Sequence, residues 1–275
     1  MAFLVAALLL AGCASAPSST SGKAVVRIKG SDTMLLLVSR WAEEFMKLHP
    51  EIAIYAEGGG TETGIDALIN GKAELSAASR TLRAEEARLL LEKRRSLGYS
   101  VLTAKDALSV YLHPDNPVRN LSLEQTRDIF TGRRTLWTEF GGNPVPVLVV
   151  GRQPNSGTQL FFEEHVLEGA AYASSTLTVP TTKAVVRMVK RHRGAIGYGG
   201  LAFGADVTHA SIDGVAPTAG NVRDGSYPIS RYLYLYAAEP PAGAVKEFID
   251  WILSNHGQRV VSDVGYIPLW DVTGE

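Results

Sequence analysis

Three loops rich in glycine, serine and threonine constrain the fold of this chain most, because each follows a predicted strand and opens a predicted helix. They read GSDTM at residues 30–34, GGGTETG at 58–64 and GRQPNSGTQ at 151–159. In open α/β sheets such loops lie at the carboxyl ends of the strands, where ligands bind. Their backbone N–H groups, hydroxyls and positive helix ends could converge on one small anion. The glycines would let the backbone approach that ligand closely.

A simpler explanation of the loop hydroxyls is that Ser31, Thr61 and Ser156 only cap their own helices. For one loop this explanation is the better one, but three loops of the same design favour a shared ligand. A buried dianion must also be paired and hydrogen-bonded, because its desolvation is costly. Arg152 and Arg80 are the candidate partners, although a surface salt bridge would explain either arginine alone.

From Lys23 onward, short β-branched runs alternate with helical patterns, which predicts an α/β fold. Four of the expected strands lie at residues 24–30, 51–57, 73–80 and 227–238. The helix after the first strand should bury a face formed by Met34, Val38, Trp41, Phe45 and Leu48. In the last of these strands Tyr232, Tyr234 and Tyr236 alternate, which predicts core packing rather than ligand stacking.

The length and composition of the chain are those of an ordinary globular protein. Its 275 residues are enough to bury a substantial core in one or two domains. Hydrophobic residues make up 45% and charged residues 20% of the chain. The formal net charge of −1 gives no overall basic field that would attract nucleic acid or an anionic membrane. Local geometry would therefore have to hold any bound anion.

Residues 1–23 are predicted to form a signal peptide and a tether. Twelve apolar residues, too few to span a membrane, precede Cys13, and a small, polar run follows it. Leu10-Ala11-Gly12-Cys13 looks like a bacterial lipobox, in which the cysteine becomes the lipid-bearing N-terminus. The expected positive n-region is missing, so a start further upstream or trimming of the segment stays open. Because Cys13 is the lone cysteine, neither an intrachain disulfide nor a cysteine-based metal site is possible.

Five segments together resemble the phosphate-binding subunit of bacterial phosphate ABC transporters. In chain order they are GSDTM…WAEEFMKLHP, GGGTETGI, LINGKAELSAASR, NSGT and GVAPTAGNVRDGSYPISRYLYLY. The resemblance extends from about Val25 to the C-terminus. It implies a two-domain periplasmic-binding-protein fold of type II, each domain a mixed β-sheet flanked by helices, with phosphate clamped in the interdomain cleft. It also implies that the protein catalyses no reaction and that the loaded form docks on a membrane permease. No cofactor or metal is expected.

Within that fold, the first domain is expected to comprise residues 24–104 and 229–275, and the second residues 105–228. Two strands that cross between the domains would act as a hinge. The resemblance places the phosphate donors on the three loops and on the end of the third strand: Ser31, Thr33, Met34 (through its amide), Thr61, Thr63, Ser79, Arg80, Arg152, Ser156, Gly157 and Thr158.

One position departs from the family pattern. Many members have an aspartate after the serine that ends the third strand, and it accepts the proton of monohydrogen phosphate; this chain has Arg80 there. Sulfate carries no such proton, so loss of the acceptor would weaken discrimination between the two anions. Asp32 is our candidate replacement. Glu62 is a weaker candidate, because its carboxylate would repel the ligand.

Other functions stay open from the sequence. Sulfate, molybdate or another oxyanion would suit the same loops, and the protein could be a phosphate sensor or an adhesin. A phosphatase-type hydrolase is disfavoured, because GGGTETG is no Walker loop and neither a G-x-S-x-G elbow nor an H-E-x-x-H motif is present. We therefore expect a monomeric binding protein, lipid-anchored through Cys13, in the periplasm or on the outer cell surface of a bacterium.

Overall fold

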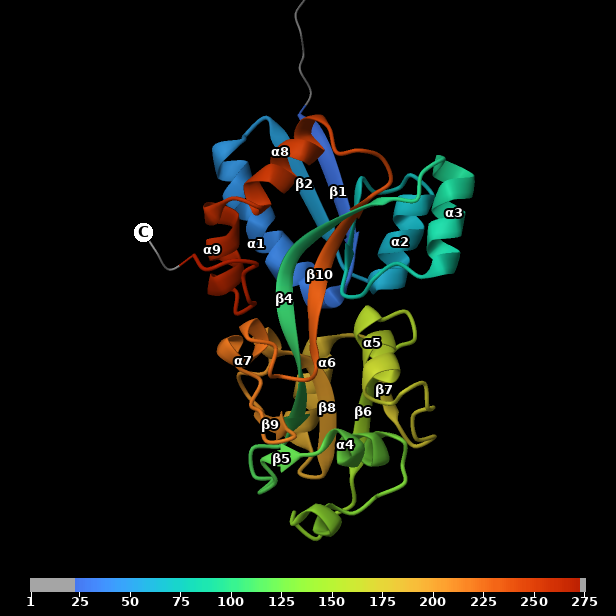
Figure 1. Cartoon of the computed structure of the whole chain (residues 1–275), viewed down its shortest axis with the longest axis vertical. Helices are drawn as coiled ribbons and strands as arrows, with labels where there is room; N and C mark the ends of the chain where they lie inside the picture. Colours follow the sequence, from blue (N-terminus) through green and yellow to red (C-terminus); the bar gives the residue numbers. More distant parts are fainter. Residues whose placement is uncertain (1–22, 273–275) are drawn as a thin grey trace, which may run out of the picture.

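The computed structural model describes residues 23–272, which form two lobes stacked along the long axis of the molecule (Figure 1). Two strands, β4 (Tyr99–Leu112) and β10 (Ser230–Ala237), run from one lobe into the other. The predicted signal peptide and Cys13 lie outside the described residues. Between residues 23 and 272, no helix combines the length and the apolar character needed to cross a bilayer.

The first lobe is a sheet with helices on both faces. Its other elements are β1 (Ala24–Gly30), α1 (Asp32–Leu48), β2 (Ile52–Glu57), α2 (Thr61–Ile69), β3 (Leu75–Ala78), α3 (Ala84–Arg94), α8 (Gly243–Ile252) and α9 (Asn255–Asp263). Strand β1 pairs in parallel with β2 and β3, and β10 pairs antiparallel with β3. Helices α1, α8 and α9 pack on one face around Trp41 and Phe45, whereas α2 and α3 pack around Ile65 and Leu90 on the other.

The second lobe is built around β4, β6 and β8. Its elements are β5 (Asn120–Leu121), α4 (Leu123–Phe130), η1 (Trp137–Phe140), β6 (Leu148–Arg152), α5 (Gly157–His165), β7 (Leu177–Val179), α6 (Thr182–Arg191), β8 (Ala195–Gly200), η2 (Leu201–Phe203), β9 (Thr208–Ile212) and α7 (Ala219–Arg223). Strand β6 pairs in parallel with β7 and β8, and β4 pairs antiparallel with β8 and β9. The rings of Phe130, Phe162 and Tyr198 pack together in its core.

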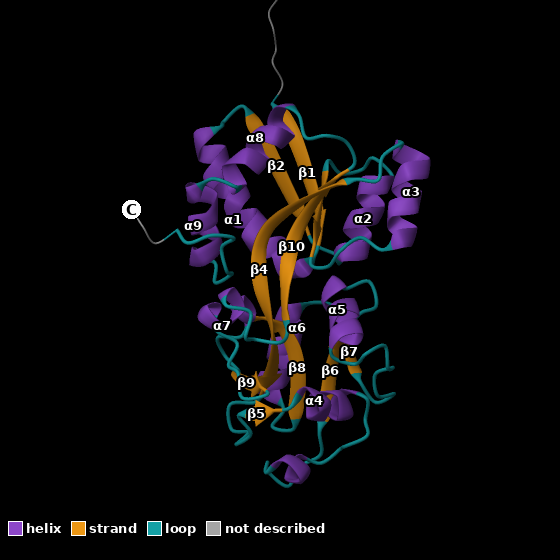
Figure 2. Ribbon diagram, viewed as in Figure 1, coloured by secondary structure: helices purple, strands orange, loops and turns teal. Residues whose placement is uncertain are grey.

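Strand pairing continues from one lobe to the other in the order β2-β1-β3-β10-β4-β8-β6-β7 (Figure 2). Strand β4 pairs with β10 over residues 99–107 and with β8 over residues 108–112. The prediction of an α/β protein with a mixed sheet flanked by helices is therefore confirmed. The return strand predicted at 227–238 is confirmed by β10.

Two predictions about buried faces need correction. Met34, Val38, Trp41 and Phe45 are buried on α1 as expected, but Leu48 is 59% exposed because it is the last residue of the helix. Of the three alternating tyrosines, Tyr236 is buried against α2 and α3, whereas Tyr232 is 40% exposed. Tyr232 lies in the crossing part of β10, which extends beyond the helices of the first lobe.

Candidate anion-binding site

The three glycine- and threonine-containing loops meet between the lobes. Each is a strand-to-helix connection as predicted, leading from β1 to α1, from β2 to α2 and from β6 to α5. The hydroxyls of Thr33 and Thr158 approach to 2.8 Å across the two lobes. The Asn155 side chain donates to the Gly59 carbonyl at 3.0 Å, and the Asn155 carbonyl accepts from the Glu62 amide at 3.3 Å. The lobes are therefore in direct contact at the loops.

A group of buried hydroxyls faces the N-terminus of α5. Thr61 Oγ1 and Ser79 Oγ, both from the first lobe, lie 3.4 Å apart, and Thr61 Oγ1 also accepts from the Ser79 amide at 3.3 Å. A Cβ atom at Gly157 would lie 2.8 Å from Ser79 Oγ and closer still to Thr61 Oγ1. The amides of Gly157 and Thr158 belong to the first turn of α5, where N–H groups lack partners within the helix.

Capping accounts for only one of the three loop hydroxyls. Ser156 precedes α5, and its hydroxyl accepts from the Gln159 amide at 3.4 Å. Ser31 precedes α1 without a capping hydrogen bond from its side chain, and Thr61 follows the capping residue Gly60 of α2. The hydroxyls of Ser31 and Thr61 are therefore not used as helix caps.

Arg152 is buried at the end of β6, with its side chain 2% exposed. Its Nη2 donates to Asp32 Oδ2 at 2.9 Å and to the Pro180 carbonyl, and its Nη1 donates to Thr182. Within residues 23–272, Nε has no hydrogen-bond partner. Burial lowers the pKa of Arg152 and Asp32 opposes that effect; the guanidinium nevertheless stays protonated.

Asp32 connects all three loops. One carboxylate oxygen accepts from the Gly59 amide at 3.1 Å, and the other accepts from Arg152. The Asp32 side chain is 14% exposed. Glu62, the weaker candidate acceptor, instead pairs with Arg83 at 2.9 Å near the surface.

Three predicted site residues use their polar groups elsewhere. The Arg80 guanidinium donates to both carboxylate oxygens of Glu86, at 2.8 and 2.6 Å. The Thr63 hydroxyl donates to the Gly59 carbonyl in its own loop at 2.8 Å. The Met34 amide donates to the Ser31 carbonyl at 3.0 Å, and its side chain lies in the core. The Thr63 hydroxyl and the Met34 amide are therefore already engaged. Arg80 holds Glu86 through Nη1 and Nη2, and its Nε has no hydrogen-bond partner among residues 23–272.

The Arg80–Glu86 pair makes the stability of the first lobe sensitive to acid. Burial alone would raise the pKa of Glu86, but hydrogen bonds from Arg80 and Arg83 and their charges outweigh it, so the pKa is lowered. This stabilisation is present above the unfolded-state pKa of about 4.3 and is lost as the pH falls through the lower folded-state value. At pH 7 we expect Glu86→Gln to cost about 3 kcal/mol, because it leaves a buried arginine without a charged partner.

Urea unfolding of wild type and Glu86→Gln between pH 3 and pH 7 measures how much the Arg80–Glu86 pair stabilises the protein. The difference between wild type and Glu86→Gln should shrink as the pH falls below about 4.3. Exposed Glu85→Gln is the matched control and should follow wild type closely. A difference that is the same at every pH would contradict the role given to the pair.

Arg231 lies beside the site, although it was not predicted from the sequence as a site residue. It pairs with Asp106 at 2.8 Å and donates to Thr158 Oγ1 at 3.2 Å and to the Ser79 carbonyl at 3.3 Å. Strand alternation gave a signal, because Arg231 shares a strand face with Leu233, which is fully buried. An arginine on a buried strand face needs a charged or hydrogen-bonding partner, and this requirement marks Arg231 as a candidate site residue.

Each of the three buried arginines near the loops has a carboxylate partner: Arg80 has Glu86, Arg152 has Asp32 and Arg231 has Asp106. The pairs largely cancel the positive charge. Hydroxyls, helix N-terminal amides and the remaining Arg152 donor would therefore hold an anion mainly by hydrogen bonds.

A possible metal-ligand group lies away from the loops, at the C-terminal end of α1. His49, Glu51 and Glu247 place one ligand atom each within 4.8 Å of the others. Both glutamates are exposed, and no other such group occurs between residues 23 and 272. It takes no part in the anion site.

Comparisons with known proteins agree with this geometry. Residues 16–256 match the PBP superfamily domain. The phosphate-binding protein PstS of Bacillus subtilis is 32% identical over 261 residues, which cover 94% of this chain and 85% of that protein. This chain belongs to the PstS family. The PstS of Pseudomonas aeruginosa is also 32% identical, over 87% of this chain and 81% of its own length.

Solved structures show that the likeness extends to the fold of PstS proteins. A substrate-binding protein of Clostridium perfringens, assigned to a phosphate ABC transporter and solved with bound phosphate, superposes with a TM-score of 0.83. It is 32% identical, and the match covers 90% of this chain and all of that chain (100%). A phosphate transport receptor from Vibrio cholerae has a TM-score of 0.73 at 27% identity, covering 88% and 99% of the two chains.

Proposed function

We propose that this protein captures inorganic phosphate between its two lobes and delivers it to an ABC permease, without chemical turnover. The observation that carries the proposal is the convergence of the three loops, which brings buried hydroxyls from both lobes against the N-terminus of α5. In this proposal the lobes are the two domains of a type II binding protein, residues 24–104 with 229–275 and residues 105–228. Strands β4 and β10 form the hinge.

The donors divide between the domains. The first contributes Ser31, Thr33, Thr61 and Ser79, and the second contributes the α5 amides of Gly157 and Thr158, the hydroxyls of Ser156 and Thr158, and Arg152. Closure excludes water and so strengthens each charge-assisted hydrogen bond to the anion. Thr63 and Met34 act indirectly by holding the loops, since their polar groups are engaged there. Arg80 acts indirectly through its pair with Glu86.

Calorimetric titration of phosphate-stripped protein with phosphate, sulfate and molybdate, from mildly acidic to mildly basic pH, tests this function. We expect tight phosphate binding and little response to sulfate or molybdate. Equal binding of phosphate and sulfate would remove the phosphate assignment. Binding of none of them would refute the anion-binding function itself.

Asp32 is the proposed acceptor for the proton of monohydrogen phosphate. Its carboxylate touches Arg152 and the glycine loop, so it lies where both domains meet. We expect Asp32→Asn to weaken phosphate binding on the order of tenfold and to increase tolerance of sulfate, because an amide can donate to an oxygen that bears no proton. Titration with both anions gives the ratio of their dissociation constants; an unchanged ratio would rule out the acceptor role. Glu62→Gln, near the surface and paired with Arg83, is the matched control.

Attachment to the membrane through lipid on Cys13 and a location in the periplasm or on the outer cell surface complete the proposal. Their support is the lipobox-like sequence before the tether, together with the family's role beside a membrane permease. A sensing role would use the same binding site, and loss of phosphate uptake on deletion of the gene would favour transport.

A further inference from the structure

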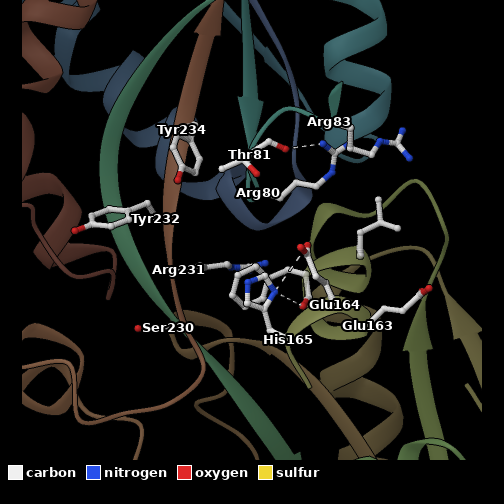
Figure 3. Close-up of a pocket in the computed structure, with 12 residues that line it drawn as sticks. Arg80, Thr81, Arg83, Glu163, Glu164, His165, Ser230, Arg231, Tyr232 and Tyr234 are labelled. Atoms are coloured by element: carbon white, nitrogen blue, oxygen red, sulfur yellow. Dashed lines mark hydrogen bonds and ion pairs between the residues drawn. The ribbon is translucent and has the colours of Figure 1, made fainter. Parts of the chain in front are cut away.

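Arg231 lies in β10, one of the two strands that run from one lobe into the other. It stands directly opposite Asp106 in the register of β10 and β4, and the two side chains are 2% and 1% exposed. Its Nε and Nη2 both donate to Asp106 Oδ2, at 3.1 and 2.8 Å. Figure 3 shows the side chain extending from β10 toward α5, where its Cζ lies 5.5 Å from the centre of the Phe161 ring.

Two further hydrogen bonds connect this guanidinium to both lobes. Nη1 donates to the carbonyl of Ser79, which follows β3 in the first lobe. Nη2 donates to the hydroxyl of Thr158, in the first turn of α5 in the second lobe. Because Ser79 and Thr158 belong to different lobes, Arg231 can make both contacts only while the lobes are together.

The contact with Thr158 has a consequence for the direction of its hydroxyl proton. A guanidinium can only donate, so Thr158 Oγ1 must accept from Arg231. The single proton of that hydroxyl then points elsewhere, toward Thr33 Oγ1 at 2.8 Å or toward a ligand oxygen beside it.

We propose that Arg231 is a positioning residue that presents the Thr158 hydroxyl as a donor to the bound anion and does so only in the closed arrangement. Asp106 holds the guanidinium in place and balances its charge, so Arg231 acts through Thr158 and Ser79 rather than by touching the anion. This role rests on the proposed binding of phosphate.

A double-mutant cycle tests the coupling. Removing Arg231 alone would leave Asp106 buried and unpaired, so the pair is replaced together as Asp106→Leu with Arg231→Met, an exchange that buried ion pairs often tolerate. This pair variant, Thr158→Val and their combination are titrated with phosphate, and thermal unfolding is recorded for each. The matched control is Arg127→Met with Glu168→Leu, which removes an arginine–carboxylate pair of the second lobe that lies away from the loops.

If Arg231 acts through Thr158, the pair variant and Thr158→Val should each weaken phosphate binding on the order of tenfold, and their combination no more than Thr158→Val alone. Effects that multiply to about a hundredfold, or a pair variant that binds like wild type, would overturn the inference. Failure of the wild type to bind phosphate would instead refute the proposed function.

A second variant covers the case in which the pair variant does not fold. Arg231→Lys keeps a charge beside Asp106 but loses the planar fork that reaches Ser79 and Thr158 together. Phosphate binding should fall in this variant, and adding Thr158→Val should weaken it no further than Thr158→Val does alone. Wild-type affinity in Arg231→Lys, or full multiplication with Thr158→Val, would overturn the proposal.

Discussion

Replacement of Arg152 by methionine is expected to raise the dissociation constant for phosphate on the order of a thousandfold, the largest effect of any single substitution. Two losses combine. The anion loses a charge-assisted hydrogen bond, which is worth about 1.5–3 kcal/mol. Asp32 also loses its cationic partner and then faces the anion as an unbalanced carboxylate.

Calorimetric titration of Arg152→Met with phosphate measures this effect, and thermal unfolding shows whether the variant folds. Arg152→Lys should lie between wild type and Arg152→Met, because it keeps the charge but cannot bridge Asp32 and Thr182 in one plane. Arg127→Met, in the same lobe but bonded to Val166 and Glu168, is the control. A dissociation constant within about threefold of wild type would contradict the assignment of Arg152 as a ligand.

Replacement of Gly157 by alanine should weaken phosphate binding roughly ten- to a hundredfold with little loss of folding stability. The added Cβ would press on the hydroxyls of Thr61 and Ser79, and overpacking of this kind costs about 1–3 kcal/mol. Both hydroxyls belong to the first lobe, so the clash arises when the lobes meet. At a helix N-terminus alanine itself is well tolerated.

Phosphate affinity and thermal stability are both measured for Gly157→Ala and for wild type. Gly220→Ala is the matched control, because Gly220 also lies in the first turn of a helix, α7, but its added Cβ would make only an ordinary contact with the Thr218 hydroxyl, at 3.9 Å. Gly220→Ala should bind phosphate as wild type does. If Gly157→Ala kept full affinity, the packing of α5 against the first lobe would not be part of the binding site.

Sequence reasoning was strongest where structure is decided by near neighbours. The three strand–loop–helix connections lie where they were expected. It was weaker at the ends of elements. Leu48 continues the periodic face of α1, but the helix ends there and the side chain is exposed.

The arginines show the limit of sequence reasoning most clearly. Arg80 follows the serine at the end of β3 and has the position of a ligand, yet Glu86 takes its guanidinium. Arg231 lies within the strand predicted at 227–238, and it donates to groups that lie 152 and 73 positions away in the chain. Such partners depend on which side chains the fold buries together.

The sequence by itself determined the α/β class and the three loops, because glycine freedom, strand alternation and helix starts depend on residues a few positions apart. Only the tertiary structure decided which polar groups are free. It paired Arg80 with Glu86 and engaged the Thr63 hydroxyl with the Gly59 carbonyl, while Nε of Arg80 and of Arg152 stayed without a hydrogen-bond partner among the described residues. Burial explains the difference, because a charge removed from water takes the nearest available partner, and the fold alone determines which partner is near.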